Sequence, residues 1–198
     1  MACRSLRDIT KDSCQSNKGG LFTKVWLTNR SWLTFRADEE GSDSNPGNDG
    51  IVTLGWATDG QGTQHTPSDM HTLAYRKQSS GLTSEGTFDD ANGISFFTNN
   101  LALVFARQDV QKRLAIQALA LQEDLAVIVA DSNHEIYFLG YDDSVTTTAA
   151  GAATGTAATD ANQYTITLTD ISNELPYMVD PENLKTLLGL TSVDDIWK

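Results

Sequence analysis

The most regular alternation of apolar and polar positions runs over residues 164–169. One phase consists of Tyr164, Ile166 and Leu168, and the other consists of Thr165, Thr167 and Thr169. Successive side chains of a strand point to opposite faces, so this pattern predicts a strand with one face on a core. The threonine face is expected to meet solvent or a lumen.

A second strand signal lies at residues 125–130, where both phases are apolar. Leu125, Val127 and Val129 alternate with smaller or branched apolar residues at 126, 128 and 130. Such a strand is covered on both sides. Residues 131–133 have turn chemistry, and residues 134–141 are expected to return as the partner strand.

The segment 93–106 changes phase in its middle. Ile94 and Phe96 share one side of an extended chain, whereas Leu101, Leu103 and Phe105 fall on the other. This slip predicts a β-bulge or sharp bend near residues 99–100, or else two short strands joined by a turn.

Residues 109–122 have the period of a helix. Asp109 can cap its start, and Val110, Leu114, Ala118 and Leu121 share one face. Gln117 alone interrupts the apolar run 115–121. The helix is therefore expected to be deeply buried or covered by a neighbouring subunit, with Leu114 and Leu121 as candidate interface residues.

The C-terminal residues 180–198 predict a short helical arm. Asp180 can cap, Pro181 suits the first helical position, and Gly189 can end the helix. Such an arm either folds back on its own body or docks into a neighbour. We hypothesise that it joins one subunit to the next through its apolar residues Leu184, Leu187, Leu188 and Trp197.

The remaining pattern completes a mainly β fold, a β-sandwich or half-barrel with one flanking helix. Residues 1–20 are expected to form an N-terminal arm and residues 21–179 a β domain. Further short strands are expected at 21–28, 32–35, 51–56, 73–76 and 82–88. Polar loops are expected at 38–50, 59–69 and 142–162, and the last of these is either a long loop or a weak hairpin rich in Thr, Ala and Gly.

Composition limits the classes of function. The 198 residues suit one domain, and 26 acidic against 14 basic residues give a net charge of -12. This balance argues against a nucleic-acid binder with a basic face, although nucleic acid can pass nearby without binding. No signal-peptide or membrane-length apolar run is present, so we expect a soluble chain without a membrane segment.

Residues that could carry chemistry are scattered. Cys3 and Cys14 have no histidine nearby, so free thiols are expected, or a disulfide if the protein matures in an oxidising compartment. The histidines His65, His71 and His134 have no metal-pair spacing. Adjacent carboxylates, as at 89–90 and 142–143, are typical of solvated loops. The sequence predicts no enzyme, no metal and no cofactor.

Several segments, in their order along residues 14–179, resemble tail tube or tail-tube-like structural proteins of bacteriophages infecting Bacteroidetes. They are Cys14 followed by Gly19-Gly20 and a strand, the run 93–107 entering 114–121, Tyr137-Phe138-Leu139-Gly140, Gly155-Thr156-Ala157 with Asp160, and the strand 164–168. The loops before Leu73 and the tail after Pro181 are longer than a minimal tube subunit needs.

The resemblance implies a virion protein assembled in the bacterial host cytoplasm. Subunits would join edge to edge into a hexameric ring, rings would stack into a tube, and double-stranded DNA would pass through the lumen without specific binding. Other tail or head-proximal virion proteins would be partners. The alternative within this class is a head-to-tail adaptor, ring or decoration protein.

Two alternatives come from other classes. A carbohydrate-binding or adhesive β-sandwich would expose some of the four tryptophans, at positions 26, 32, 56 and 197, for stacking on sugars. A hydrolase would bring Asp and His residues together in a cleft.

Overall fold

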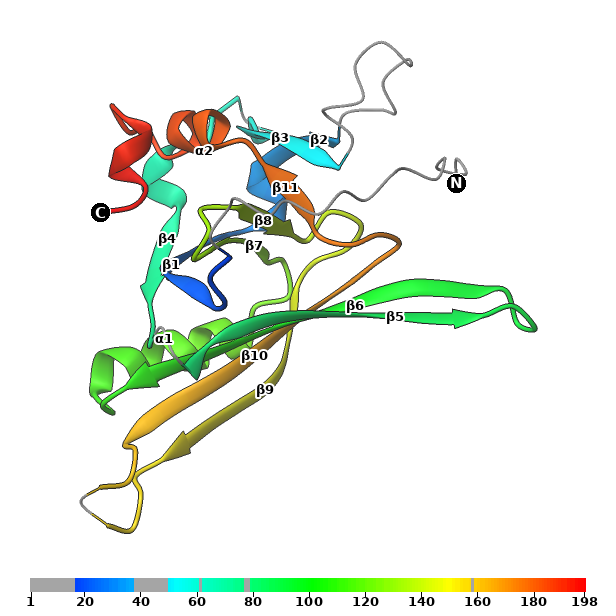
Figure 1. The fold of residues 1–198 in the computed structure, drawn as a ribbon. Helices are drawn as coiled ribbons and strands as arrows, with labels where there is room; N and C mark the ends of the chain where they lie inside the picture. The colour runs from blue at the N-terminus through cyan, green and yellow to red at the C-terminus, as the bar shows by residue number, and fades with distance from the viewer. Residues whose placement is uncertain (1–16, 38–49, 61, 77–78, 158) are drawn as a thin grey trace.

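The computed structural model describes residues 17–37, 50–60, 62–76, 79–157 and 159–198 (Figure 1). Two β-sheets stack on one another, with a short helix between them at one end and a second short helix over the far face of the larger sheet. The predicted mainly β sandwich with a flanking helix is confirmed. Cys3, Cys14, most of the N-terminal arm and most of the loop 38–50 lie outside the described residues.

The larger sheet has seven strands in the order β2-β3-β11-β8-β7-β1-β4. Its strands are β1 (Leu21–Thr28), β2 (Leu33–Ala37), β3 (Ile51–Trp56), β4 (His71–Ala74), β7 (Ala126–Asp131), β8 (Ile136–Leu139) and β11 (Tyr177–Val179). β11 pairs with β3 in parallel, and the other pairs are antiparallel.

The smaller sheet has four antiparallel strands in the order β5-β6-β10-β9. They are β5 (Gly81–Asp89), β6 (Ile94–Ala106), β10 (Gln163–Ser172) and β9 (Thr146–Ala153). The expectation of a loop over 142–162 is therefore wrong for its middle, and the hairpin alternative holds. The small Thr, Ala and Gly residues of this segment form an exposed edge strand. Its hydrogen bonds to β10 hold it in the strand conformation.

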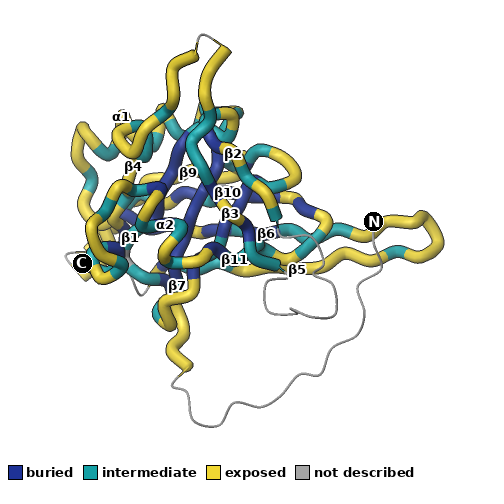
Figure 2. Tube along the Cα trace, turned by 90° about the horizontal axis from the view of Figure 1, so that it is seen from above, coloured by how far each residue is buried: buried dark blue, intermediate teal, exposed yellow. Residues whose placement is uncertain are grey.

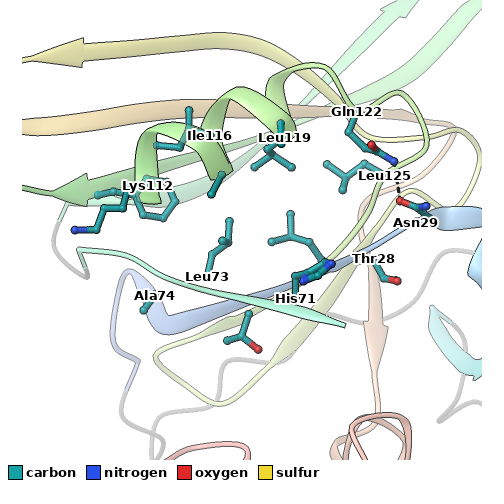
Figure 3. A pocket seen from close by; sticks show the side chains of 15 residues that line it. Thr28, Asn29, His71, Leu73, Ala74, Lys112, Ile116, Leu119, Gln122 and Leu125 are labelled. Atoms are coloured by element: carbon teal, nitrogen blue, oxygen red, sulfur yellow. Dashed lines mark hydrogen bonds between the residues drawn. The ribbon is translucent and has the colours of Figure 1, made fainter. Parts of the chain in front are cut away.

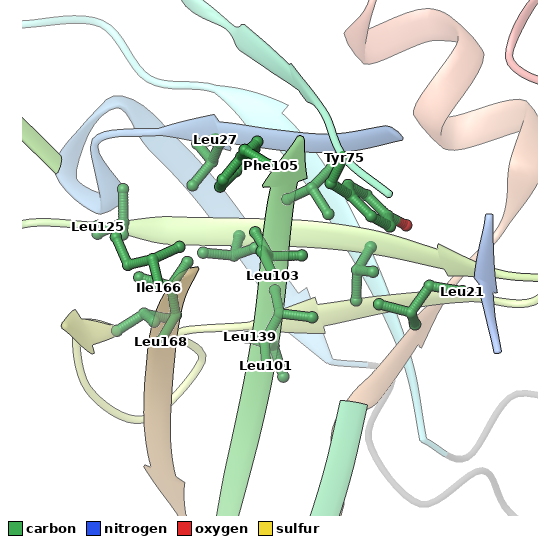
Figure 4. Close-up of a cluster of buried hydrophobic side chains, with 14 residues drawn as sticks. Leu21, Leu27, Tyr75, Leu101, Leu103, Phe105, Leu125, Leu139, Ile166 and Leu168 are labelled. Carbon is green, nitrogen blue, oxygen red and sulfur yellow. The ribbon is translucent and has the colours of Figure 1, made fainter. Parts of the chain in front are cut away.

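The main core lies between the two sheets (Figure 4). Leu101, Leu103, Ile166 and Leu168 of the small sheet meet residues of β1, β7 and β8. A second core lies on the other face of the large sheet. β7 supplies Val127 to the first core and its even-numbered residues to the second, which is why both of its phases are apolar.

β6 is one continuous strand, so the predicted bulge, bend or turn near residues 99–100 is wrong. Its register with β10 and with β5 runs through Asn99 and Asn100 without a shift. The apolar phase changes because β6 has two environments. Its second half lies on the core, whereas its first residues, 94–96, extend past the last β10 pair, Ser172 with Phe97, as a hairpin with β5 (Figure 1).

The helix α1 (Val110–Ala120) begins at the predicted cap, since Asp109 accepts a hydrogen bond from the Lys112 N–H. Deep burial was a wrong expectation, because no residue of α1 is buried. Ile116 and Leu119 pack against the main core. The predicted apolar face points outward instead, leaving Leu114 53% and Leu121 79% exposed.

The C-terminal arm folds back on its own chain. The helix α2 (Pro181–Leu187) has the predicted Asp180 cap, and Gly189 at φ 65° follows it. The amide of Asn183 exchanges two hydrogen bonds of 2.9 Å with the backbone of Leu54, continuing the ladder that β11 forms with β3. The C-terminal arm thereby covers the second core.

Candidate functional site

One face of the small sheet points away from the sandwich and carries mostly small polar side chains. The strand registers place on this threonine face the residues Thr83, Glu85, Thr87, Thr98, Asn100, Ala102, Thr146, Ala149, Gly151, Thr165, Thr167 and Thr169. The same face also carries four larger apolar residues, Ile94, Phe96, Val104 and Ile171. Ile166 and Leu168 point the other way and are buried, as the sequence predicted. Thr165 is exposed, Thr167 is half-buried and Thr169 is buried.

Thr169 is buried because its neighbours on the threonine face cover it. Its hydroxyl donates to Asn100 Oδ1 at 2.7 Å and lies 2.8 Å from the Thr148 hydroxyl. Thr83 stands opposite Asn100 and donates to the Asn100 carbonyl at 3.5 Å. A row of hydrogen bonds therefore crosses all four strands.

The small sheet has no positive charge of its own. Its four strands, all of whose residues are described, contain no Lys, Arg or His, and they carry the acidic residues Glu85, Asp89 and Asp170. A phosphate backbone gains no counterion release on such a surface.

Both edges of the small sheet are open among the described residues. β5 and β9 each pair with one strand, and most of their residues are exposed (Figure 2). An open edge presents unpaired N–H and C=O groups that template pairing with another chain. β9 is protected neither by proline nor by charge, because it reads Thr-Thr-Thr-Ala-Ala-Gly-Ala-Ala.

A buried polar cluster lies on the core side of the small sheet, where the β5–β6 hairpin leaves the sandwich. The Asn99 amide donates to Asp170 at 2.9 Å and to the Ser172 hydroxyl at 3.1 Å, and Asp170 accepts from the Gly140 N–H at 3.2 Å. Burial raises the pKa of Asp170. The cluster was not predicted from the sequence, although Asp170 falls in the apolar phase of its strand.

An apolar groove of about 620 Å³ opens between α1 and the edge strand β4 (Figure 3). Its wall is built by Leu27, Leu73, Phe105, Ile116, Leu119 and Leu125. Lys112, His71 and Gln122 lie at the groove, and Gln122 donates to Asn29 Oδ1. The groove and the exposed face of α1 together form an exposed apolar surface at this end of the molecule.

The six predicted interface residues do not form one surface. Leu184 and Leu187 are 0% and 2% exposed within the chain's own second core, so their predicted role in joining subunits is wrong. They are buried because α2 docks on β3 through Asn183. Leu188 is half-buried beside them, and Trp197 stacks on His134 with ring centroids 4.4 Å apart.

Leu114 on α1 and Leu121 at its C-cap remain exposed, and α1 borders the first core. They lie on the other side of the large sheet from the C-terminal arm.

The tryptophans and histidines have local structural contacts. Trp26 is 3% exposed, the Trp56 indole donates to the Leu187 carbonyl at 2.9 Å, and Trp32 stacks on His65 at 4.7 Å. Trp26 is buried, and each of the other three rings, including Trp197, contacts another residue of the chain. The three histidines lie at separate places, against Trp32, at the α1 groove and against Trp197.

Metal-binding clusters and membrane-length helices are both missing from the described part of the chain. It holds no group of three or more His, Cys, Asp or Glu side chains placed to bind a metal ion. No helix among these residues has the length and apolar character needed to cross a membrane.

Comparison of the chain with protein-family models, with curated proteins and with solved structures finds no match.

Proposed function

We propose that the protein is a bacteriophage tail tube subunit. Copies join through the open edges of the small sheet into a ring, which is hexameric as the sequence resemblance implies, and rings stack into a tube that conducts double-stranded DNA. The protein acts by assembly, without catalysis or a cofactor. It is built into the virion tail from the host cytoplasm, where other tail and head-proximal proteins are its partners.

The observation that carries this proposal is the pair of open edges. The sheet has four strands of alternating direction, so β5 and β9 at its two edges run in opposite directions. Rotation about a ring axis keeps strand direction from copy to copy. β9 of one copy therefore meets β5 of the next as an antiparallel pair, and the alternation continues around the ring without interruption.

The proposal also accounts for the two unlike faces of the small sheet. Closing the sheet into a barrel turns one face inward, and the sandwich already covers the apolar face. The threonine face then lines the lumen, including Thr165, Thr167 and Thr169. Its lack of Lys and Arg, together with the net charge of -12, keeps passing DNA mobile.

Size-exclusion chromatography with light scattering, followed by negative-stain electron microscopy, tests the proposal on the purified chain. Rings or hollow tubes of defined copy number are expected. Isolated rings that never stack would favour the head-to-tail adaptor or ring protein instead. A monomer at every concentration, including conditions of high protein and low salt, would overturn both assembly functions.

A further inference from the structure

We propose that the α1 groove binds an extended segment of another protein. The segment adds to β4 as a further strand, and it carries an acidic cluster followed by apolar residues at alternate positions. The inference goes beyond the proposed function, because β4 is an edge of the larger sheet whereas the ring would close through the edges of the smaller one.

β4 leaves one side of its backbone unpaired. It is the last strand of the larger sheet and pairs only with β1 among the described strands. All four of its residues, His71–Ala74, line the groove, although successive side chains of a strand point to opposite faces. The backbone of β4 therefore lines the groove as well. An open edge of this kind accepts an extended peptide as an added strand.

The helix α1 forms the opposite wall of the groove (Figure 3). Ile116 and Leu119 pack against the main core from this wall, yet both stay half-buried. About 620 Å³ of mostly apolar space remains between α1 and β4, whereas a packed interior leaves few voids larger than a water molecule. Alternate side chains of an added strand would enter this space, so every second residue of the segment must be apolar.

Three arginines gather at one end of the groove. Ala74 and Lys112 mark this end in Figure 3. Arg76 follows β4 closely in the chain, and Arg113 is the neighbour of Lys112 on α1. Arg107 comes directly after β6, and its carbonyl accepts a hydrogen bond of 3.1 Å from the Lys112 ammonium. The groove thus has one end rich in positive charge.

These arginines have no carboxylate partner within the described part of the chain. All three side chains are exposed, and none makes an ion pair with another described residue. The groove itself is lined by neither Asp nor Glu, in a chain with 26 acidic residues. An acidic cluster on the segment supplies the complementary charge. Antiparallel pairing, the more stable kind, places this cluster before the apolar residues, because the arginines lie at the end where β4 finishes.

The order of an acidic pair before an apolar strand occurs in this chain, but those strands are not free. Residues 89–90 precede β6 and residues 123–124 precede β7. β6 lies between β5 and β10, and β7 lies between β8 and β1. A second copy would have to unfold to supply either strand. A separate protein is therefore the occupant that the structure favours.

Binding of synthetic peptides to the full-length chain tests the proposal. The probe is a capped, fluorescent peptide with an aspartate cluster followed by alternating Val and Ser, long enough to cover the four residues of β4. One control has lysines in place of the aspartates, and another has the same composition with all Val grouped together. Fluorescence anisotropy is expected to show saturable binding of the probe and at least about tenfold weaker binding of both controls. Equal binding of the three peptides overturns the inference.

Reversal of the charged end gives a sharper test. The combined variant Arg76→Glu, Arg107→Glu and Arg113→Glu is expected to bind the lysine peptide more tightly than the aspartate peptide. All three positions are exposed, so the fold should tolerate these changes. A variant that keeps the preference for the aspartate peptide shows that the arginines do not face the segment, and the proposal is then wrong.

A carboxylate placed inside the groove tests its apolar wall. Ala115→Glu is expected to weaken binding of the aspartate peptide by about tenfold, because Ala115 lines the groove. Leu121→Glu is the matched control at the C-cap of α1, where the side chain is 79% exposed and does not line the groove. Equal affinities of the two variants, at unchanged midpoints of thermal unfolding, contradict binding in the groove.

Amide hydrogen exchange identifies strand addition. The N–H groups of β4 that point away from β1 are expected to exchange more slowly when the aspartate peptide is bound. Binding of the peptide with unchanged exchange throughout β4 contradicts the added strand.

The remaining outcomes concern other occupants and the proposed function. Self-association that Ala115→Glu abolishes would assign the groove to a second copy and overturn the inference. Binding to vesicles of phosphatidylglycerol, with no binding of the peptide, would assign it to a membrane surface and overturn it too. Rings without peptide binding contradict this inference alone, whereas peptide binding by a chain that never forms rings contradicts the proposed function alone.

Discussion

The Thr169 hydroxyl bonds Asn100 Oδ1 at 2.7 Å on the threonine face, one residue along from the pair that Asp170 and Asn99 form on the core face at 2.9 Å. Both pairs lie directly across β10 and β6. A slip of one residue would move each polar pair to the wrong face and bury a mismatched set. These four side chains therefore specify the register where the β5–β6 hairpin leaves the sandwich.

Replacing Thr169 with valine tests the outer pair. The variant is expected to lose about 1 kcal/mol of the free energy of unfolding, because Asn100 Oδ1 and the Thr148 hydroxyl each lose a partner. Thr165→Val on the same face is the control and is expected to stay within about 0.5 kcal/mol, since Thr165 is exposed. Urea unfolding of the three proteins measures the difference, and equal losses in both variants would contradict the role of the pair.

The inner pair predicts a pH effect. Burial raises the pKa of Asp170, and the charges of Asp142 and Asp143 raise it further, against hydrogen bonds from Asn99 and the Gly140 N–H. An acid with a higher pKa in the folded state binds more protons when folded. The contribution of Asp170 to stability is therefore largest below the ordinary carboxyl value of 3.8 and falls as pH rises through the raised folded pKa.

Asp170→Asn removes this titration while keeping an acceptor for the Gly140 N–H. The free energy of unfolding of the variant should increase relative to that of wild type as pH is raised from about 4 toward 7. Thermal unfolding across this range measures the difference curve. A flat difference curve for Asp170→Asn would contradict the raised pKa of Asp170.

The docked C-terminal arm predicts a loss of stability within a single chain. Leu184→Ala is expected to cost about 2–5 kcal/mol of the free energy of unfolding, because Leu184 is 0% exposed. Leu121→Ala, at the C-cap of α1 where the side chain is 79% exposed, should stay within about 0.5 kcal/mol. Chemical denaturation of monomeric protein measures both. A Leu184→Ala variant with wild-type stability would mean that the C-terminal arm packs elsewhere in solution.

Proline substitutions at the β9 edge test ring closure with a built-in control. N–H groups of successive residues in an edge strand point alternately toward the partner strand and toward the open side. Gly151→Pro and Ala152→Pro therefore remove one N–H of each kind, since these residues lie opposite Thr165 and Tyr164.

The two variants should differ in which property they lose, thermal stability or ring formation. One is expected to lower the midpoint of thermal unfolding through a lost bond to β10, and the other to keep its stability and lose the ring. Rings that survive in both variants would exclude β9 as the joining edge. Light scattering gives the copy number, and circular dichroism gives the midpoint.

The sequence alone predicted the strands and helix starts that depend only on neighbouring residues. The period of two in β10, the doubly apolar β7, and the caps at Asp109 and Asp180 all predicted what the structure shows. These signals depend on the few residues around each position, because alternation and capping act over one or two turns of chain. The mainly β class follows from them.

Tertiary structure decided everything that depends on which segments meet. β9 has no apolar phase, and only its ladder with β10 makes it a strand. The phase change in β6 comes with the passage from the core to the β5–β6 hairpin, and not from a bulge, because the register with β10 runs unshifted from Ala106 to Phe97. Leu184 and Leu121 look alike in sequence, yet one is buried and the other is exposed, because Asn183 anchors α2 to β3 while α1 turns its predicted face outward. Burial is a property of the neighbours that the fold brings together, and no local pattern contains them.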